Sequence, residues 1–257
     1  MSLYGVDTVK VGGINTACLG RRQLASLIAE QCQHISPAGN SSMPILVFSN
    51  NAHAISIANR DEHTMRLLGE AEIIHADGQS VVAFSKLRRG RIIPERSATT
   101  DMIHDIPSII AEPIKHFLLG GKERVVKKAA TVLARKYSNF LVCGAMHGYF
   151  SESDELAICK QINESGAQIL WVGLGKPAEQ EFCVRNRDKL DVAVVITCGG
   201  CFNFVTGEYA RAPLWLQNYG LEWLHRMVTN PRKLFWRYFI TNPHALWIVI
   251  KEQLFKS

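Results

Sequence analysis

Short runs of β-branched and other apolar residues alternate with segments of helical periodicity along most of this 257-residue chain. The run 45–48 carries no polar side chain, which is typical of a strand covered on both faces. Strands that alternate with helices indicate βαβ units, so we expect an α/β fold with a mostly parallel sheet flanked by helices. The expected strands cover residues 44–49, 72–75, 116–119, 140–143, 168–174 and 192–197. The expected helices cover residues 22–33, 52–59, 79–88, 122–136, 153–165 and 178–188.

The composition changes near residue 211. From there to the end the chain holds seven Lys or Arg and two Asp or Glu, which supplies five of the six net positive charges, and four of the five tryptophans. Pro213, Pro231 and Pro243 divide this part into about three helical pieces. We therefore expect an α/β domain over residues 1–210 and a basic, aromatic-rich helical appendage over residues 211–257.

The chain contains no apolar stretch near the roughly 18 residues that a membrane span needs. Residues 1–16 lack the pattern of a secretory signal, so we expect a cytoplasmic protein, soluble or peripheral to a membrane. The cysteine count of seven is odd, which favours buried thiols over disulfides. Cys198-Gly-Gly-Cys201 has no second ligand pair, so we expect two packed thiols and no metal site there.

Polar residues directly after the expected strands are the candidate site residues, because parallel sheets bind ligands beyond the carboxyl ends of their strands. Asp77, in the run Ala76-Asp77-Gly78, either caps the next helix or serves as a functional carboxylate. Ser49 and Asn51 either form a turn and cap or contact a ligand. Arg96 lies in a polar loop and is either a surface residue or a phosphate ligand.

Two glycine-containing turns follow later strands. Gly120 opens a turn in which backbone N–H groups can approach a phosphate, although a plain strand-to-helix turn fits equally well. Gly175 lies in the other turn, ahead of Glu179 and Gln180 at a helix start. These two side chains either serve the helix start or contact a ligand.

Several motifs occur together and in order. They are Asn51-Ala52, Ala76-Asp77-Gly78, Pro94-Glu95-Arg96 with Asp101, Gly148-Tyr149-Phe150, Gly173-Leu174-Gly175-Lys176-Pro177, Gly199-Gly200 with Phe202, and Arg211-Ala212-Pro213 through Gly220-Leu221-Glu222-Trp223-Leu224-His225-Arg226. With this order and spacing, from about residue 6 to about residue 237, the chain resembles the WecG/TagA/CpsF glycosyltransferases (glycosyltransferase family 26).

The resemblance implies a Rossmann-like α/β layer with a C-terminal helical appendage. It also implies an inverting transfer of a hexose-type sugar from a UDP-sugar to a polyprenyl-diphosphate-linked saccharide, in bacterial surface or exopolysaccharide synthesis. Asp77 matches the proposed general base of the family. The implied donor-binding residues are Ser49, Asn51, Gln79, Arg96, Gly120, Gly175, Glu179 and Gln180. Arg226, Arg232 and Arg237 fall near the appendage arginines that are thought to meet the donor diphosphate or lipid phosphates.

This chain departs from the family pattern at two places. The family commonly has Pro-Lys-Gln-Glu where this chain has Pro177-Ala178-Glu179-Gln180, which leaves the roles of Glu179 and Gln180 open. The family often has Phe-Asp where this chain has Phe202-Asn203, which leaves the donor sugar open.

The departing UDP needs cations or N–H groups to hold its developing charge. The chain has no Asp-x-Asp, so we expect no cofactor and metal-independent catalysis in which arginines and helix N-termini hold the diphosphate. The basic, aromatic tail predicts a peripheral protein on the anionic cytoplasmic face of the bacterial inner membrane. Packing of the tail on the domain or in a homo-oligomer is the alternative.

Two other functions compete with glycosyl transfer. A nicotinamide-dependent oxidoreductase needs a dinucleotide fingerprint, which neither Gly120-Gly121 nor Gly173-x-Gly175 supplies. A basic nucleic-acid-binding protein fits the net charge of +6. The chain has no nucleic-acid motif, however, and its aromatic tail suits lipid better, so no nucleic-acid partner is expected.

Overall fold

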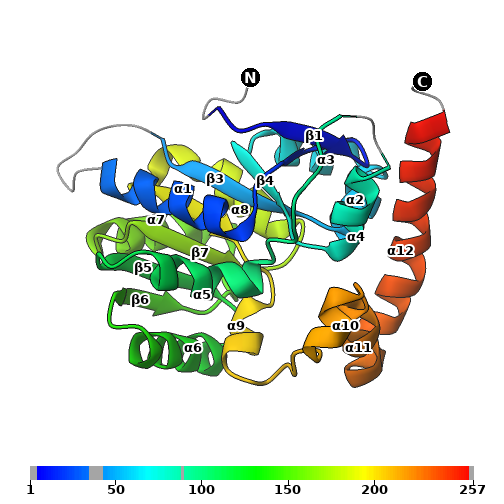
Figure 1. Cartoon of the computed structure of the whole chain (residues 1–257). Coiled ribbons are helices and arrows are strands. Elements are labelled where there is room, and N and C mark those ends of the chain that lie inside the picture. Colours follow the sequence, from blue (N-terminus) through cyan, green and yellow to red (C-terminus); the bar gives the residue numbers. More distant parts are fainter. Residues whose placement is uncertain (1–4, 35–42, 88–89, 255–257) are drawn as a thin grey trace. The chain divides into compact units, whose positions relative to one another are not determined.

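The structure is a computed structural model that describes residues 5–34, 43–87 and 90–254 (Figure 1). Within these residues the strands are β1 (Thr8–Val11), β2 (Ile14–Ala17), β3 (Ile45–Asn50), β4 (Ile73–Ala76), β5 (Ile114–Gly120), β6 (Phe140–Met146), β7 (Ile169–Gly173) and β8 (Val194–Thr197). The helices are α1 (Arg21–His34), α2 (Ala52–Ala58), α3 (Glu62–Gly69), α4 (Gln79–Ser85), α5 (Thr99–Ile109), α6 (Glu123–Lys136), α7 (Glu155–Glu164), α8 (Ala178–Arg185), α9 (Cys201–Val205), α10 (Leu214–Asn218), α11 (Glu222–Thr229) and α12 (Pro231–Leu254). Two short 3₁₀ helices, η1 (Glu152–Asp154) and η2 (Arg187–Lys189), precede α7 and follow α8.

The main sheet of the described chain has six strands in the order β4-β3-β8-β7-β5-β6. β3 pairs with β8, β8 with β7, β7 with β5 and β5 with β6, and each of these pairs is parallel. β1 and β2 form a separate antiparallel hairpin. The predicted Rossmann-like α/β fold with a parallel sheet, flanking helices and a C-terminal helical segment is confirmed.

The central strands are buried at every position and are apolar except at their carboxyl ends, where β3 has Ser49 and Asn50 and β8 has Thr197. β3, β7 and β8 have no exposed residue, and Trp171 in β7 is fully buried. Burial of one large apolar side chain contributes roughly 1.5–3 kcal/mol, so these runs supply much of the folding free energy. The prediction of a strand covered on both faces at residues 45–48 is confirmed.

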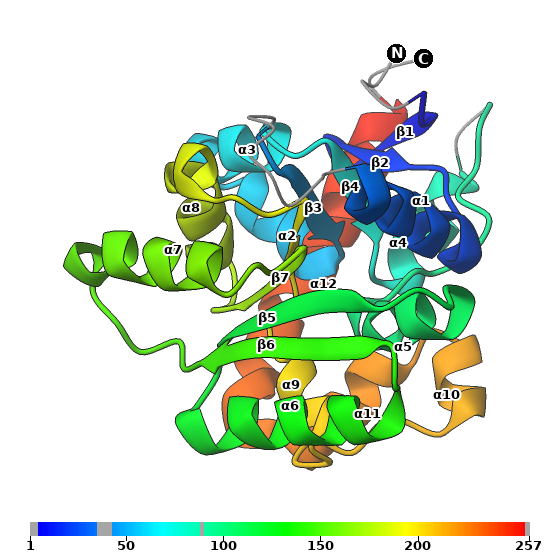
Figure 2. The same cartoon turned by 90° about the vertical axis from the view of Figure 1, so that its left-hand side faces the viewer.

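The chain forms two compact units. Unit 1 comprises Met1–Gly20, Ser49–Ala98 and Tyr209–Ser257, and unit 2 comprises Arg21–Phe48 and Thr99–Glu208. In unit 2, α6 packs against β5 and β6 (Figure 2). Also in unit 2, α8 packs against β7 and β8. Unit 1 holds the C-terminal helices α10 to α12 together with the β1–β2 hairpin and α2 to α4.

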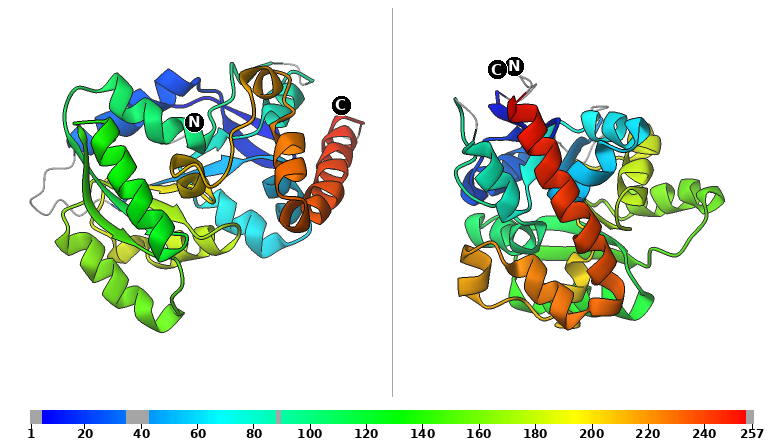
Figure 3. Two further views of the ribbon diagram at one scale, coloured as in Figure 1. Left: turned by 90° about the horizontal axis from the view of Figure 1, so that it is seen from below. Right: turned by 90° about the vertical axis from the view of Figure 1, so that its right-hand side faces the viewer.

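The last helix, α12, packs along α2 in unit 1 (Figure 3). His244 Nδ1 lies 2.9 Å from Ser56 Oγ, and the Glu252 carboxylate accepts from the N–H groups of Gly12 at 3.0 Å and Gly13 at 3.3 Å. Polar side chains of α12 thus bond to both α2 and the turn of the β1–β2 hairpin. No helix in the described ranges is both long and apolar enough to cross a bilayer.

Two elements of unit 1 were absent from the expected strands and helices. The β1–β2 hairpin turns at Gly12 and Gly13, whose φ angles of 60° and 84° are left-handed and suit glycine. The second missed element, α3, begins after Asp61, whose side chain accepts from the N–H groups of His63 and Thr64. The Gly-Gly pair and the capping Asp were the local signals for both.

The C-terminal segment has the expected number of helical pieces, but only two of its prolines mark boundaries. Pro213 is the N-cap of α10, and Pro231 is the first residue of α12, where a proline needs no helical N–H partner. Pro243 lies inside α12, so it does not end a helix as we expected. The packing of α12 on α2 continues past it, with Ala245, Ile248 and Val249 buried.

Candidate functional site

Asp77 lies directly after β4, whose four residues are all buried, and its own side chain is half-buried. Its backbone N–H donates to the Asn50 carbonyl at 2.9 Å, which ties this turn to the end of β3. Asn51 Nδ2 donates to Asp77 Oδ2 at 3.0 Å. Gly78, which has no side chain, is the N-cap of α4. The Asp77 carboxylate therefore accepts from the side-chain amide that caps α2.

Asn51 has two separate roles at the start of α2. Its Oδ1 accepts from the Ala54 N–H at 2.9 Å, so the predicted cap is present. Its Nδ2 is the donor to Asp77. Because both polar atoms have partners, the Asn51 amide has one fixed orientation, and it fixes the Asp77 carboxylate in turn.

The two residues ahead of Asn51 are buried in β3. Ser49 is 5% exposed and Asn50 is fully buried. Asn50 Nδ2 donates to Thr16 Oγ1 at 2.8 Å, which joins β3 to the β1–β2 hairpin within unit 1. Asn50 and Thr16 were not among the expected site residues, because nothing local marks a buried amide that pairs over this sequence distance.

Arg96 is held by side chains of the C-terminal segment. Its Nη1 lies 2.5 Å from Glu222 Oε2, and its Nη2 donates to Gln217 Oε1 at 3.0 Å. The side chains of Arg96 and Glu222 are each only 14% exposed. Arg211 Nη2 also donates to Gln217 Oε1, at 3.3 Å. The arginine that was expected to meet a donor is thus engaged with α10 and α11.

The three arginines expected to meet phosphates lie on the last two helices. Arg226 is half-buried on α11, and Arg232 is exposed in the first turn of α12. Arg237 stacks its guanidinium over the Tyr238 ring at 5.1 Å from the centroid. This stacking orients the guanidinium of Arg237 without neutralising its charge.

In unit 2, the Glu179 carboxylate joins the loops that follow β7 and β8. Its Oε2 accepts from the N–H groups of Gly175 at 3.1 Å and Gly199 at 2.9 Å, and Lys176 Nζ lies 3.6 Å from its Oε1. Glu179 and Gln180 are 2% and 1% exposed. Gln180 Nε2 donates to Glu179 Oε1 at 3.4 Å. Glu179 is therefore a structural link between two loops.

Gly120 is required by a close backbone approach. Its φ is 139°, and an added Cβ would lie 2.3 Å from the Gly173 carbonyl oxygen. The neighbouring Gly121 N–H donates to the same oxygen at 3.2 Å. The close approach to β7 therefore explains why position 120 is a glycine, and a part of Gly120 in donor binding stays a prediction.

The Cys198-Gly-Gly-Cys201 thiols are free and buried, as we expected. Burial raises the pKa of the Cys198 thiol well above its usual value, so the thiol stays protonated. Among the described residues, no group of three or more His, Cys, Asp or Glu side chains is placed to hold a metal ion. Metal-independent catalysis stays a prediction.

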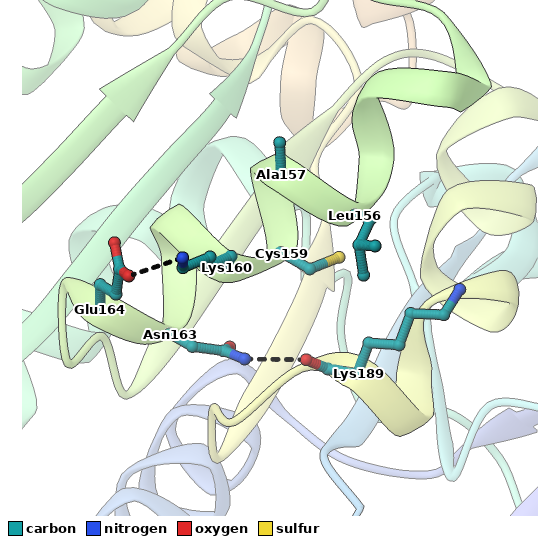
Figure 4. A pocket seen from close by; sticks show the side chains of 7 residues that line it. All are labelled: Leu156, Ala157, Cys159, Lys160, Asn163, Glu164 and Lys189. Carbon is teal, nitrogen blue, oxygen red and sulfur yellow. Dashed lines mark hydrogen bonds and ion pairs between the residues drawn. The ribbon is translucent and has the colours of Figure 1, made fainter.

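A cavity of about 530 Å³ lies beside α7 and η2 in unit 2 (Figure 4). Its lining residues are Leu156, Ala157, Cys159, Lys160, Asn163, Glu164 and Lys189. Figure 4 shows the Lys160 ammonium directed at Glu164, and the Asn163 amide at the Lys189 carbonyl. The predicted site residues are all within the described chain, and none of them lines this cavity.

Comparison with known proteins identifies the chain. The profile of the glycosyl transferase WecG/TagA/CpsF family matches residues 9–257, almost the whole chain. An N-acetylglucosaminyldiphosphoundecaprenol N-acetyl-beta-D-mannosaminyltransferase of Bacillus subtilis (strain 168) is 29% identical over 197 residues, which are 76% of this chain and 75% of that protein. The chain belongs to the WecG/TagA/CpsF family and is a glycosyltransferase.

Proposed function

We propose that this glycosyltransferase moves a hexose-type sugar from a UDP-sugar to a polyprenyl-diphosphate-linked saccharide, with inversion and with Asp77 as the general base. Family membership supports glycosyl transfer over hydride transfer or nucleic-acid binding. The Bacillus subtilis relative is named for transfer of N-acetylmannosamine to a diphosphoundecaprenol-linked N-acetylglucosamine, which supports a lipid-linked acceptor here. The Asn51–Asp77 hydrogen bond is the observation that carries the role of Asp77.

The proposed reaction is one in-line displacement at the anomeric carbon. The acceptor hydroxyl oxygen forms a bond to that carbon as the bond to the UDP oxygen breaks, and UDP leaves with the electron pair. The hydroxyl proton passes to the Asp77 carboxylate. Asn51 holds that carboxylate through its Oδ2, at 3.0 Å, and so keeps it directed for proton transfer.

The remaining predicted residues have binding roles in this proposal. We assign donor binding to Ser49, Asn51, Gln79, Gly120, Gly175 and Gln180, and a loop-holding role to Glu179, because its carboxylate already accepts from two backbone N–H groups. Arg226, Arg232 and Arg237 would neutralise the diphosphate of the donor or of the lipid without a metal ion.

Replacement of Asp77 by Asn tests the base directly. Loss of general base catalysis is expected to lower kcat by about 100-fold or more, since proton transfer contributes roughly 10²–10⁴-fold. The control is Asp188→Asn, because Asp188 is exposed on η2. Transfer is measured with a panel of UDP-sugars and a short lipid-diphosphate sugar. Near-normal transfer by a folded Asp77→Asn protein would remove Asp77 from this role.

The proposal includes peripheral binding to the anionic cytoplasmic face of the inner membrane through α12. One face of α12 packs on unit 1 through Leu234, Tyr238, Ala245 and other buried residues. The opposite face exposes a helical stripe of large apolar side chains: Phe235, Trp236, Phe239, Ile240, Leu246, Trp247, Ile250 and Leu254. Arg232 and Lys251 are exposed on the same helix. Basic amphipathic helices with aromatic faces bind anionic lipid surfaces.

Substitution of the exposed stripe tests membrane binding without removing the buried side of α12. The variant carries Trp236→Gln, Phe239→Gln and Trp247→Gln, and the control carries Tyr149→Gln and Leu156→Gln, two exposed apolar residues elsewhere. We expect the first variant to lose co-sedimentation with anionic vesicles and the control to retain it. Equal sedimentation of both variants would contradict the proposal. A stable dimer that forms in the absence of vesicles and buries this stripe would also contradict it.

A further inference from the structure

The loop that carries Arg96 is joined to the turn that carries Asp77. The Ser97 N–H donates to the Ala76 carbonyl at 2.8 Å, and Ser97 is 2% exposed. Ala76 is the last residue of β4 and immediately precedes Asp77. Because this bond is buried and joins the residue after Arg96 to the residue before Asp77, the Arg96 backbone is held close to that of Asp77.

The Arg96 side chain continues this connection to the C-terminal segment of the same unit. It pairs with Glu222, in the first turn of α11, and with Gln217 on α10. The planar guanidinium has enough donors to engage both partners at once. Both members of the ion pair are mostly buried, so removal of either one leaves a charge that solvent cannot fully stabilise.

A second contact joins the same two parts of unit 1. Gly220, between α10 and α11, has a φ of 73°, and an added Cβ would lie 3.1 Å from Gln79 Cγ. Gln79 is the first residue of α4, two positions after Asp77. The α10–α11 connection thus touches the segment after Asp77, while Glu222 holds the loop that is bonded to the residue before Asp77.

We propose that Arg96, Glu222 and Gln217 form a latch that positions the α10–α11 segment against the Asp77 turn. Glu222 and Arg226 are four residues apart on α11 and therefore share one face of that helix. The latch sets the direction of Arg226 relative to Asp77. Arg96 and Glu222 are positioning residues that act through α11, and Arg96 does not bind the donor diphosphate.

Charge exchange across the pair tests the latch. The variants are Arg96→Glu, Glu222→Arg and the double exchange, and the matched control exchanges the exposed Arg66–Glu62 pair on α3 of the same unit. Each single change places like charges in contact, so we expect amide hydrogen exchange to accelerate across residues 211–229 and kcat/KM to fall about 10- to 100-fold. The double exchange is expected to restore protection and most of the activity. The control exchange is expected to change neither.

The hydrogen-exchange measurement needs no substrate, so it reports on the latch separately from the proposed function on which the activity readout rests. Protection that is restored in the double variant without any recovery of transfer would show that Arg96 contacts the donor, and would overturn the positioning role. Unchanged protection in both single variants would also overturn the latch. Where a charge reversal prevents folding, Glu222→Gln and Gln217→Ala provide milder versions, for which we expect partial loss of protection and a raised KM for the donor.

Discussion

The Asn51 amide donates to Asp77 Oδ2 at 3.0 Å while its carbonyl oxygen accepts from the first turn of α2. One side chain therefore caps a helix and orients the proposed catalytic carboxylate. The helix cannot shift without moving that carboxylate, which couples the stability of α2 to the geometry of the site.

Substitutions of Asn51 separate these two functions. Asn51→Ser keeps a capping oxygen and removes the amide donor, so we expect a nearly unchanged Tm and transfer reduced about 10-fold or more. Asn51→Ala removes both and is expected to cost about 1 kcal/mol of stability as well. Thermal denaturation and transfer assays on the same preparations measure both effects.

The control for the capping effect is Asp61→Ala, which removes the N-cap of α3 in the same unit. We expect a similar loss of stability from it, with transfer unchanged. Wild-type transfer by Asn51→Ser would show that Asp77 does not depend on the amide.

His116 predicts a specific pH dependence of stability. It lies in β5, stacked on Phe140 with ring centroids 3.6 Å apart, and Trp171 Nε1 donates to its Nδ1 at 3.2 Å. Burial lowers the pKa of His116 from 6.5 to about 3, so the folded protein holds it neutral. The unfolded chain takes up this proton first. Above about pH 6.5 His116 is neutral in both states and does not alter the free energy of unfolding. As the pH falls toward 3, the free energy of unfolding declines by up to about 1.4 kcal/mol per pH unit.

The variant His116→Gln keeps an acceptor for Trp171 and removes this titration. Its free energy of unfolding, measured with urea between pH 4 and 7, is expected to vary less with pH than that of the wild type. Replacement of the exposed His63 by Gln is the control and is expected to leave the dependence as it is. Equal slopes for wild type and His116→Gln would contradict a neutral buried His116.

Glu179 and Gln180 are expected to respond differently to replacement by Ala. Glu179→Ala leaves the N–H groups of Gly175 and Gly199 without their acceptor, and each such group costs roughly 1–3 kcal/mol when buried. We therefore expect a large fall in Tm. Gln180→Ala is expected to keep a higher Tm and to raise the KM for the donor. A large fall in Tm for Gln180→Ala, with a raised KM for Glu179→Ala, would instead assign donor binding to Glu179 and the loop-holding role to Gln180.

Chelation tests the proposed metal independence. With arginines holding the diphosphate, transfer is expected to persist in excess EDTA after dialysis, and Mg²⁺ or Mn²⁺ should not raise it more than about two-fold. Arg226→Ala and Arg237→Ala should then each lower kcat/KM for the donor. Complete loss of transfer in EDTA that Mg²⁺ restores would contradict the prediction.

The sequence by itself determined the elements that rest on local patterns. Apolar runs identified β3, β7 and β8, because strands that are buried on both faces consist mostly of apolar residues. The position of Asp77 after a strand followed from the same alternation of strands and helices. The motif order was enough to indicate the family, which the profile match shows. The hairpin at Gly12 and Gly13 was missed, although its turn signal was present.

Only the tertiary structure decided which side chains meet. Arg96 and Glu222 are 126 residues apart, and Asn51 and Asp77 are 26 apart, so neither periodicity nor local spacing predicts their contact. Glu179 Oε2 accepts from two loops, through Gly175 four residues away and Gly199 20 residues away. Local patterns depend on neighbours in the chain, whereas these pairings depend on where the packed backbone brings distant segments together. That is why the fold and the family could be predicted from the sequence, while the hydrogen-bond partners of Arg96 and Glu179 could not.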